Sequence, residues 1–291
     1  MKFAIQRCCG TSVFLKQYES STDAVLVTLG LEPVEIKEFN CCGYPVKNLN
    51  RMAYLLSSAR NLALAEKRNL NIMTVCSCCY GTLKDVNQVL RGDIAEREGV
   101  NSHLEKEGLS YGGGVEVRHV LEILYKEIGL DGIRKRIVKP FQGLKVAAHY
   151  GCHLLRPRQV AEFDNPNNPS ILDELVEVTG AATTSWASKL ECCGSPLWGV
   201  NDELSMDLAE RKIRDARDSG ADYLCVVCPF CQLQFDRAQR MLMSVRGITN
   251  PLPSILFTQL LGISLGVDEG ILGISDNELD ATGIRKFLVA L

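Results

Sequence analysis

The cysteines of this 291-residue chain form two sets with the same order and nearly the same spacing. Each set has a lone cysteine, then Cys-Cys-Gly-x-Pro, then Cys-x-x-Cys; the middle motif reads "FNCCGYPV" at 39–46 and "LECCGSPL" at 190–197. Offsets of 143, 151 and 152 residues match Cys9 with Cys152, Cys41 with Cys192, and Cys76 with Cys228. A repeat of this length predicts two copies of one folding unit.

The flanking residues predict the fold class of each copy. Short apolar runs end in the lone cysteines ("KFAIQRCC", "KVAAHYGC") and in the Cys-x-x-Cys motifs ("NIMTVCSCC", "DYLCVVCPFC"). Helical periodicity follows at 51–68 and 203–220, and apolar helices are predicted at 117–130 and 253–266. Strands that alternate with helices indicate an α/β fold: two pseudo-symmetric repeats, each a small parallel sheet flanked by helices.

This fold predicts where the cysteines meet. Three cysteine groups follow three predicted strands in each repeat, and parallel sheets collect the loops after their strands at one carboxyl edge. We therefore expect the cysteines of each repeat to converge in one site at that edge. Pro140 and Gly143 place the domain boundary near 139–145, which gives domains 1–142 and 143–291. Residues 267–291 have no counterpart in the first repeat and are expected to pack across it or onto a partner.

Composition excludes several classes of protein. The net charge is −3, without the basic surface expected of a nucleic-acid-binding protein, and no run of eighteen apolar residues predicts a membrane span. The N-terminus lacks a signal-peptide pattern, so a cytoplasmic protein is expected. Thirteen cysteines in such a chain indicate metal binding or redox chemistry rather than disulfides.

The number of cysteines per repeat narrows the choice of metal. A structural zinc site and a cubane iron–sulfur cluster each take four ligands, whereas each repeat offers five. Five soft ligands favour a larger or irregular iron–sulfur assembly. The glycine after each Cys-Cys pair is expected to let the backbone approach such a cluster without a Cβ in the way. The chain shows no dinucleotide-binding glycine motif and no ferredoxin-type cysteine run.

These motifs resemble the B subunits of heterodisulfide reductases, a family built from two cysteine-rich CCG domains. The resemblance covers the whole chain and implies two non-cubane [4Fe-4S] clusters that face one substrate, the mixed disulfide of coenzyme M and coenzyme B in methanogens. It implies five ligands for each cluster: Cys9, Cys41, Cys42, Cys76 and Cys79 for the first, and Cys152, Cys192, Cys193, Cys228 and Cys231 for the second. Cys78 is the alternative to Cys76 or Cys79, and alignment of "CSCC" with "CPFC" favours the pair Cys76 and Cys79.

The resemblance also implies an activity and partners. The chain would be the catalytic subunit of a disulfide reductase. Its electrons would come from a ferredoxin-like subunit and a flavin-containing subunit of the same complex, with a hydrogenase or formate dehydrogenase module as a further source. The small-molecule disulfide would be its substrate. An iron–sulfur electron-transfer subunit of another oxidoreductase, of lactate or glycolate type, stays open as an alternative, and so does a zinc-binding scaffold.

Further side chains near the motifs have candidate roles. His153 follows Cys152 and could deliver a proton to a departing thiolate at the second cluster; the alternative is a structural histidine. Arg156 and Arg158 could bind anionic groups of the substrate, although most such side chains are merely solvated. His149, Cys8 and Cys225 are expected to be structural: His149 ends a strand, Cys8 aligns with Gly151 and is a small buried residue, and Cys225 packs in a strand.

Overall fold

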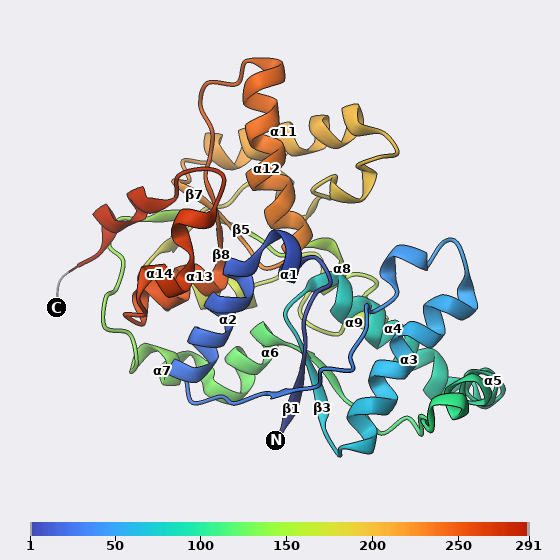
Figure 1. Ribbon diagram of the computed structural model, residues 1–291. Coiled ribbons are helices and arrows are strands. Elements are labelled where there is room, and N and C mark those ends of the chain that lie inside the picture. Colours follow the sequence, from blue (N-terminus) through green and yellow to red (C-terminus); the bar gives the residue numbers. More distant parts are fainter. Residues whose placement is uncertain (1, 290–291) are drawn as a thin grey trace. The chain divides into compact units, whose positions relative to one another are not determined.

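Two four-stranded parallel sheets organise the protein in the computed structural model, which describes residues 2–289 (Figure 1). Their strand orders are β2-β1-β3-β4 and β6-β5-β7-β8, so the two sheets share one topology. The strands are β1 (Phe3–Gln6), β2 (Val34–Glu35), β3 (Asn71–Thr74), β4 (Val117–His119), β5 (Lys145–His149), β6 (Ala182–Thr183), β7 (Tyr223–Val226) and β8 (Ser254–Leu256). The predicted α/β fold with two parallel sheets is confirmed.

Each sheet has a fourth strand where the sequence predicted only a helix. In the first sheet β4 pairs with β3, with Val117 opposite Ile72, and in the second β8 pairs with β7, with Ser254 opposite Leu224. Both strands are short and lead directly into apolar helices, α6 (Val120–Ile123) and α13 (Phe257–Ser264). A continuous apolar run does not separate a buried strand from a buried helix, and that is why the prediction was wrong here.

Matched helices follow the cysteine motifs. The first pair is α3 (Arg51–Lys67) and α11 (Asp202–Asp218), and the second pair is α4 (Ser77–Gly92) and α12 (Pro229–Arg246). Asn50 and Asn201 cap the first pair, each side chain accepting a backbone N–H of the first turn. The remaining α-helices are α1 (Thr11–Phe14), α2 (Lys16–Thr28), α5 (Ile94–Leu104), α7 (Gly129–Arg134), α8 (Cys152–Leu155), α9 (Arg158–Ala161), α10 (Ile171–Glu177) and α14 (Glu269–Leu272).

Seven short helical segments complete the described chain. They are η1 (Tyr44–Val46), η2 (Glu105–Glu107), the π-helical turn η3 (Leu124–Ile128), η4 (Ala187–Leu190), η5 (Ser195–Leu197), η6 (Ile274–Asp276) and η7 (Thr282–Phe287). Within residues 2–289, none of the helices combines the length and apolar content that a membrane span requires.

The chain divides into two compact units, and each unit includes residues from the other repeat. Of the described residues, the first unit contains 2–9, 32–123 and 153–163; the second contains 10–31, 124–152 and 164–289. The exchange is reciprocal, because the chain changes unit directly after Cys9 and directly after Cys152. The boundary between the two repeats near 139–145 stays a prediction.

Specific contacts hold the exchanged segments in their units. In the second unit the Tyr18 hydroxyl of α2 donates to the carbonyl of Val227 at 2.9 Å, and the hydroxyls of Ser21 and Thr258 lie 2.7 Å apart. In the first unit the Tyr80 hydroxyl of α4 donates to the carbonyl of Ala161 in α9 at 2.6 Å. Tyr18 and Tyr80 are buried, so both exchanged segments belong to the cores of their units.

The C-terminal residues also belong to the second unit. The buried Asp236 carboxylate of α12 accepts the backbone N–H groups of Glu278 and Leu279, at 2.8 and 2.9 Å. Gln17 of α2 donates to the side chain of Asn277 at 3.3 Å. The segment after α13 therefore packs on the second unit, including the part of that unit that comes from the first repeat, while residues 290–291 lie outside the described chain.

Candidate metal centres

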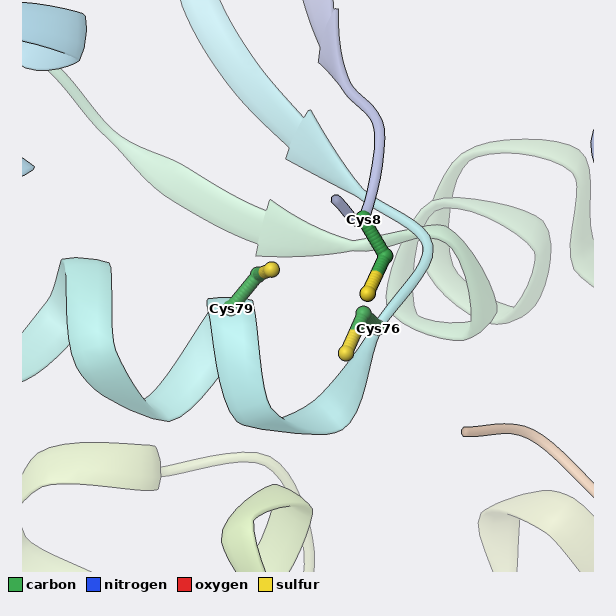
Figure 2. A group of neighbouring side chains, drawn as sticks. All are labelled: Cys8, Cys76 and Cys79. Carbon is green, nitrogen blue, oxygen red and sulfur yellow. The ribbon is translucent and has the colours of Figure 1, made fainter. Parts of the chain in front are cut away.

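The first cysteine site lies at the carboxyl edge of the first sheet, at its topological switch point. Strands β1 and β3 are neighbours whose connections leave in opposite directions along the sheet order, and ligands bind at such points in parallel α/β sheets. Cys8 follows β1, while Cys76 and Cys79 follow β3 (Figure 2). The sulfur atoms of these three cysteines lie within 4.8 Å of one another, and all three side chains are buried.

The five cysteines expected at the first site form a continuous group, here called the first thiol group. Cys9 Sγ lies 3.8 Å from Cys41 Sγ. From there the contacts run from Cys41 to Cys42, from Cys42 to Cys79, and from Cys79 to Cys76. Sequence reasoning placed Cys8 outside this set, but its thiol also contacts Cys9 and Cys79. The first site thus gathers six thiols, one more than the repeat pattern shows.

Cys78 lies on the first turn of α4, and its sulfur is within 4.8 Å of the sulfur of Cys76. Its Sγ is 3.3 Å from Nδ1 of His153, and the His153 ring meets the edge of Tyr44 at a centroid distance of 4.9 Å. The described contacts of His153 are therefore in the first unit, to which residues 153–163 belong.

The second thiol group, formed by Cys152, Cys192, Cys193, Cys228 and Cys231, repeats the arrangement within the second unit. The Cys192 thiol contacts Cys152 and Cys193, Cys231 Sγ lies 3.6 Å from Cys193 Sγ, and Cys231 contacts Cys228. In both groups the lone cysteine and the first of the Cys-Cys pair reach the surface or its edge, whereas the other three are buried. Each group therefore has one open side.

Helix geometry positions the Cys-x-x-Cys residues. Cys76 and Cys228 are the N-caps of α4 and α12, with nearly equal backbone angles (φ −126°, ψ 126° and φ −130°, ψ 129°). The second cysteine of each motif lies in the first helical turn, where unpaired backbone N–H groups and the helix dipole favour negative charge. The helix N-terminus thus favours a thiolate at each motif, whereas hydrogen bonding to Cys193 and Cys228, and then burial, raises the pKa of Cys231.

The glycines after the Cys-Cys pairs are required for a different reason from the one predicted. Gly43 and Gly194 have φ of +91° and +89°, in the left-handed region. A Cβ on Gly43 would lie 2.8 Å from Cβ of Ser57 in α3, and one on Gly194 would lie 2.8 Å from the backbone oxygen of Ser205 in α11. The absence of a side chain thus allows each turn to pack closely on a helix. The prediction had instead placed a metal cluster next to these glycines.

The turn at each glycine also brings a backbone donor to a sulfur. The N–H of Gly194 donates to Sγ of Cys192 at 3.4 Å, and the Gly43 N–H makes the equivalent bond to Cys41. The pKa of Cys41 is lowered to about 2, chiefly by Cys42 and then Cys9 as donors, and that of Cys192 to about 2 by Cys152 and then Cys193. Each group thus concentrates its negative charge on the same cysteine of the repeat.

The remaining thiols show that each group fits a bound cation. Hydrogen bonding to the thiolate of Cys41 raises the pKa of Cys42, and bonding to Cys192 raises the pKa of Cys193 to about 12. Thiols this close cannot all ionise unless a cation offsets their charge, and soft metal ions or iron–sulfur clusters are what thiolates prefer. The donor set in both groups is therefore that of a metal centre.

Buried polar side chains surround the second thiol group. His149 ends β5, as predicted, with its ring against Phe235 at a centroid distance of 5.1 Å, and neither ring nitrogen has a partner in hydrogen-bonding geometry. Burial, and then the charge of Lys212, lower the pKa of His149 to about 3. Lys212 of α11 is itself fully buried, and sequence reasoning did not identify it. Unpartnered polar atoms beside a thiol group are what a site shaped around a further group would show.

A pocket lies next to the second Cys-Cys-Gly-Ser-Pro motif in the second unit. It has a volume of about 520 Å³ and is lined mainly by apolar side chains, with Ser195 and Gln234 among the polar ones. Phe230, between the two cysteines of the second Cys-x-x-Cys motif, lines it together with Trp198. The indole N–H of Trp198 donates to Gln234, which fixes the ring in the pocket wall.

The basic residues near the motifs differ in their surroundings. Arg156 and Arg158, expected to bind substrate, are exposed in and before α9 of the first unit. Lys47 pairs with Asp85 at 3.1 Å, and Arg51 pairs with Glu96 at 2.6 Å. Cys225 is fully buried in β7, as predicted for a core residue.

Comparison with known proteins identifies relatives that match both repeats. The model of the CCG family, described as a cysteine-rich domain, matches residues 3–84 and 146–236. The B subunit of a ferredoxin/F420H2-dependent CoB-CoM heterodisulfide reductase from Methanosarcina acetivorans is 37% identical over 90% of this chain and 88% of its own. The membrane anchor subunit of an 8-methylmenaquinol:fumarate reductase from Wolinella succinogenes is 32% identical over 97% of this chain and 98% of its own.

A solved structure supports the fold. A hypothetical protein from Helicobacter pylori superposes with a TM-score of 0.79 at 17% identity over 95% of this chain, and the match covers 51% of that longer chain. With the family model matched in both repeats and a relative above 30% identity over most of its length, the chain belongs to the CCG cysteine-rich domain family and is similar to the B subunits of heterodisulfide reductases.

Proposed function

We propose that this chain is the catalytic subunit of a heterodisulfide reductase, which reduces the mixed disulfide of coenzyme M and coenzyme B to two thiols. The observation that carries the proposal is the matched pair of five-thiol groups, each at the carboxyl edge of its own parallel sheet. The names of two relatives, both B subunits of such reductases, support it.

Each thiol group would hold one non-cubane [4Fe-4S] cluster. Cys9, Cys41, Cys42, Cys76 and Cys79 would hold the first, and Cys152, Cys192, Cys193, Cys228 and Cys231 the second. When bound, two such clusters supply one electron each, which matches the two electrons that a disulfide takes up on reduction. The exposed thiols, Cys9 and Cys192, mark the side on which each site is open to a substrate.

The chain's own residues would handle protons and substrate charge. His153 is half-buried beside Cys78, with an imidazole suited to proton transfer near neutral pH, and we assign it the delivery of a proton to a departing thiolate. Arg156 and Arg158 are exposed and would bind anionic groups of the substrate through bidentate hydrogen bonds. The pocket wall formed by Trp198 and Phe230 would keep water from the second site.

Electrons would come from partner subunits. We assign this role to a ferredoxin-like subunit and a flavin-containing subunit of the same complex, with a hydrogenase or formate dehydrogenase module behind them. Relatives named as subunits of reductase complexes support partners of this kind. A cytoplasmic location stays a prediction.

One observation favours a second candidate, an electron-transfer subunit of another oxidoreductase. The relative named as a fumarate reductase membrane anchor subunit matches nearly the whole chain at 32% identity. In that case the thiol groups would hold clusters that relay electrons, and no disulfide would react at them.

Anaerobic purification followed by metal analysis and spectroscopy tests the proposal. We expect a brown protein with about eight iron atoms per chain, four for each cluster. Mixing the reduced protein with the coenzyme M–coenzyme B disulfide should release both thiols and change the paramagnetic resonance spectrum. Iron without thiol release favours the relay, and a colourless protein with two zinc ions would instead select a metal-bound scaffold.

A further inference from the structure

Lys212 is a buried cation without a carboxylate partner. Its side chain lies on α11 with 0% exposure, and its ammonium donates to the carbonyl of Ser188 and lies 4.6 Å from the ring centroid of Trp186. None of the ion pairs found within residues 2–289 includes Lys212. A buried charge is costly unless a charge of opposite sign lies nearby.

Lys212 lies beside the segment that leads into the second thiol group, because it donates to the carbonyl of Ser188, four residues before Cys192. Burial lowers the pKa of Lys212 to about 8, and the charges that oppose this shift are those of Cys193, Cys231, Glu191 and Cys192. Glu191 is 44% exposed and already pairs with Arg211. The buried negative charge that could balance this lysine is therefore that of the second thiol group when it holds a metal cluster and its cysteines are ionised.

The first site has no such cation at the matching position. The offset of 151 places Asn61 of α3 opposite Lys212. Asn61 is fully buried and neutral, and it exchanges hydrogen bonds with the backbone of Asn40, at 2.8 and 3.0 Å. Both sites thus fill the same helix position, with an amide in one and an ammonium in the other.

The neighbouring position on the same two helices does not differ between the sites. Arg60 and Arg211 also match at an offset of 151, and each pairs with a glutamate, Glu107 or Glu191. These two cations are balanced in both units. Lys212 is the unbalanced charge, and it lies on the buried face of its helix.

A second difference between the two sites also favours a higher reduction potential at the second site. His149 ends β5 where Gln6 ends β1, and both side chains are buried. The Gln6 amide is already occupied as a donor to the backbone of Arg7 and Asn40. Neither ring nitrogen of His149 has a partner in hydrogen-bonding geometry, and a backbone group of Lys189 lies nearby. An imidazole N–H would be a further donor to the second site when a cluster is bound, and donors to sulfur raise the reduction potential.

We propose that Lys212 is the counter-cation of the cluster in the second thiol group and makes that cluster the more easily reduced of the two. The inference rests on the proposed function, since it requires an iron–sulfur cluster in each group. Reduction adds negative charge, and a fixed cation nearby stabilises the reduced form. The first electron to enter the chain then resides at the second site, and the first site accepts the second electron at a lower potential.

A redox titration followed by paramagnetic resonance tests this on the whole chain. We expect two midpoint potentials, and the double variant Cys41→Ala/Cys42→Ala, which keeps only the second cluster, assigns the higher one. Lys212→Met should shift the reduction equilibrium of the second cluster at least about tenfold toward the oxidised form, which is about 59 mV for one electron. Lys212→Arg should keep the potential, and the matched variant Asn61→Lys should raise the potential of the first cluster.

The outcomes separate this inference from the function on which it depends. If both clusters are present and Lys212→Met leaves both potentials unchanged, the inference is wrong and the proposed function stands. If the Met variant loses iron, the Arg variant decides: iron retained with Arg supports a charge role, whereas iron lost with both shows a packing role and overturns the inference. A chain that binds zinc overturns both proposals.

Discussion

The two cysteine sites share their backbone and differ in the side chains packed around it. The two sites have the same strand order, the same helix N-caps and the same left-handed glycines. The lowered pKa also belongs to the same cysteine of the repeat, Cys41 in the first site and Cys192 in the second. The differences lie elsewhere. The first site adds Cys8, and it has Cys78 where the second has Phe230 and an apolar pocket.

This comparison distinguishes the residues that hold a metal group from the residues that surround it. The repeated residues are the ones that hold a metal group, since they are the thiols and the turns that position those thiols. What is not repeated gives each site its own surroundings: a histidine beside Cys78 in one unit, and a buried lysine with an apolar pocket in the other. The comparison can be tested by changing matched residues in the two sites.

Removing either Cys-Cys pair should have the largest effect. Cys41→Ala/Cys42→Ala and Cys192→Ala/Cys193→Ala should each remove about half of the iron, since each pair belongs to one group. Disulfide reduction should stop in both variants, because two electrons are needed for one disulfide. Cys225→Ala, a buried cysteine outside both groups, is the control and should keep its iron. Half of the turnover surviving in either double variant would contradict paired action.

Replacing His153 should lower turnover without loss of iron. A proton donor of this kind contributes about 100-fold or more to a rate. We expect His153→Gln to lower kcat by about that factor, with iron content and the paramagnetic resonance spectrum unchanged. Tyr44→Leu, which removes the ring that packs against His153, is the matched control for packing and should lower kcat far less. Equal losses in the two variants would show that His153 has only a structural role.

The two glycines offer a comparison of stability. A side chain at φ near +90° is strained by about 1–2 kcal/mol, and close contacts add to this. Gly43→Ala and Gly194→Ala should each lower the free energy of unfolding, measured with denaturant, by about 2 kcal/mol or more. Gly92→Ala is the control, because a Cβ there meets open space at a helix end, and it should be neutral or stabilising. A Gly194→Ala variant as stable as the native chain would contradict the packing on Ser205.

Changing Cys8 should have the smallest effect and decides whether the sites differ in ligand number. Its counterpart at the second site is Gly151, so the repeated ligand set does not include this position. Cys8→Ala should therefore keep the iron content of the chain while altering the spectrum of the first cluster alone. If about four iron atoms are lost, Cys8 is a ligand, and the first site has a larger ligand set than the second.

Sequence patterns predicted the parts of the fold that are local and repeated. The cysteine repeat predicted two sheets of the same kind, and they share one strand order. The choice of Cys76 and Cys79 over Cys78 as ligands stays a prediction, because Cys76 lies close to both of the others. The fourth strand of each sheet was missed because its residues run directly into an apolar helix. The exchange of segments between units was missed because no local pattern reports which core a helix joins.

Lys212 could have been found from the sequence. It stands in a run of charged residues, "ERKIRDARD", that is typical of a solvated surface. Its spacing of three from Ala209 and four from Ala216 nevertheless places it on the buried face of α11, next to Ile213. Helical periodicity, applied to the lysine itself, would have indicated a buried charge.

The reciprocal exchange of segments bears on how such a chain can arise and how it can be divided. Residues 10–31 complete the second unit and residues 153–163 complete the first, so neither half of the sequence contains all of its own core. Fragments 1–142 and 143–291 should fail to fold alone and should recover structure when mixed. A single-copy ancestor would have had to place the same segment in a second copy of itself, as in a domain-swapped homodimer, and gene fusion would then have made that exchange permanent.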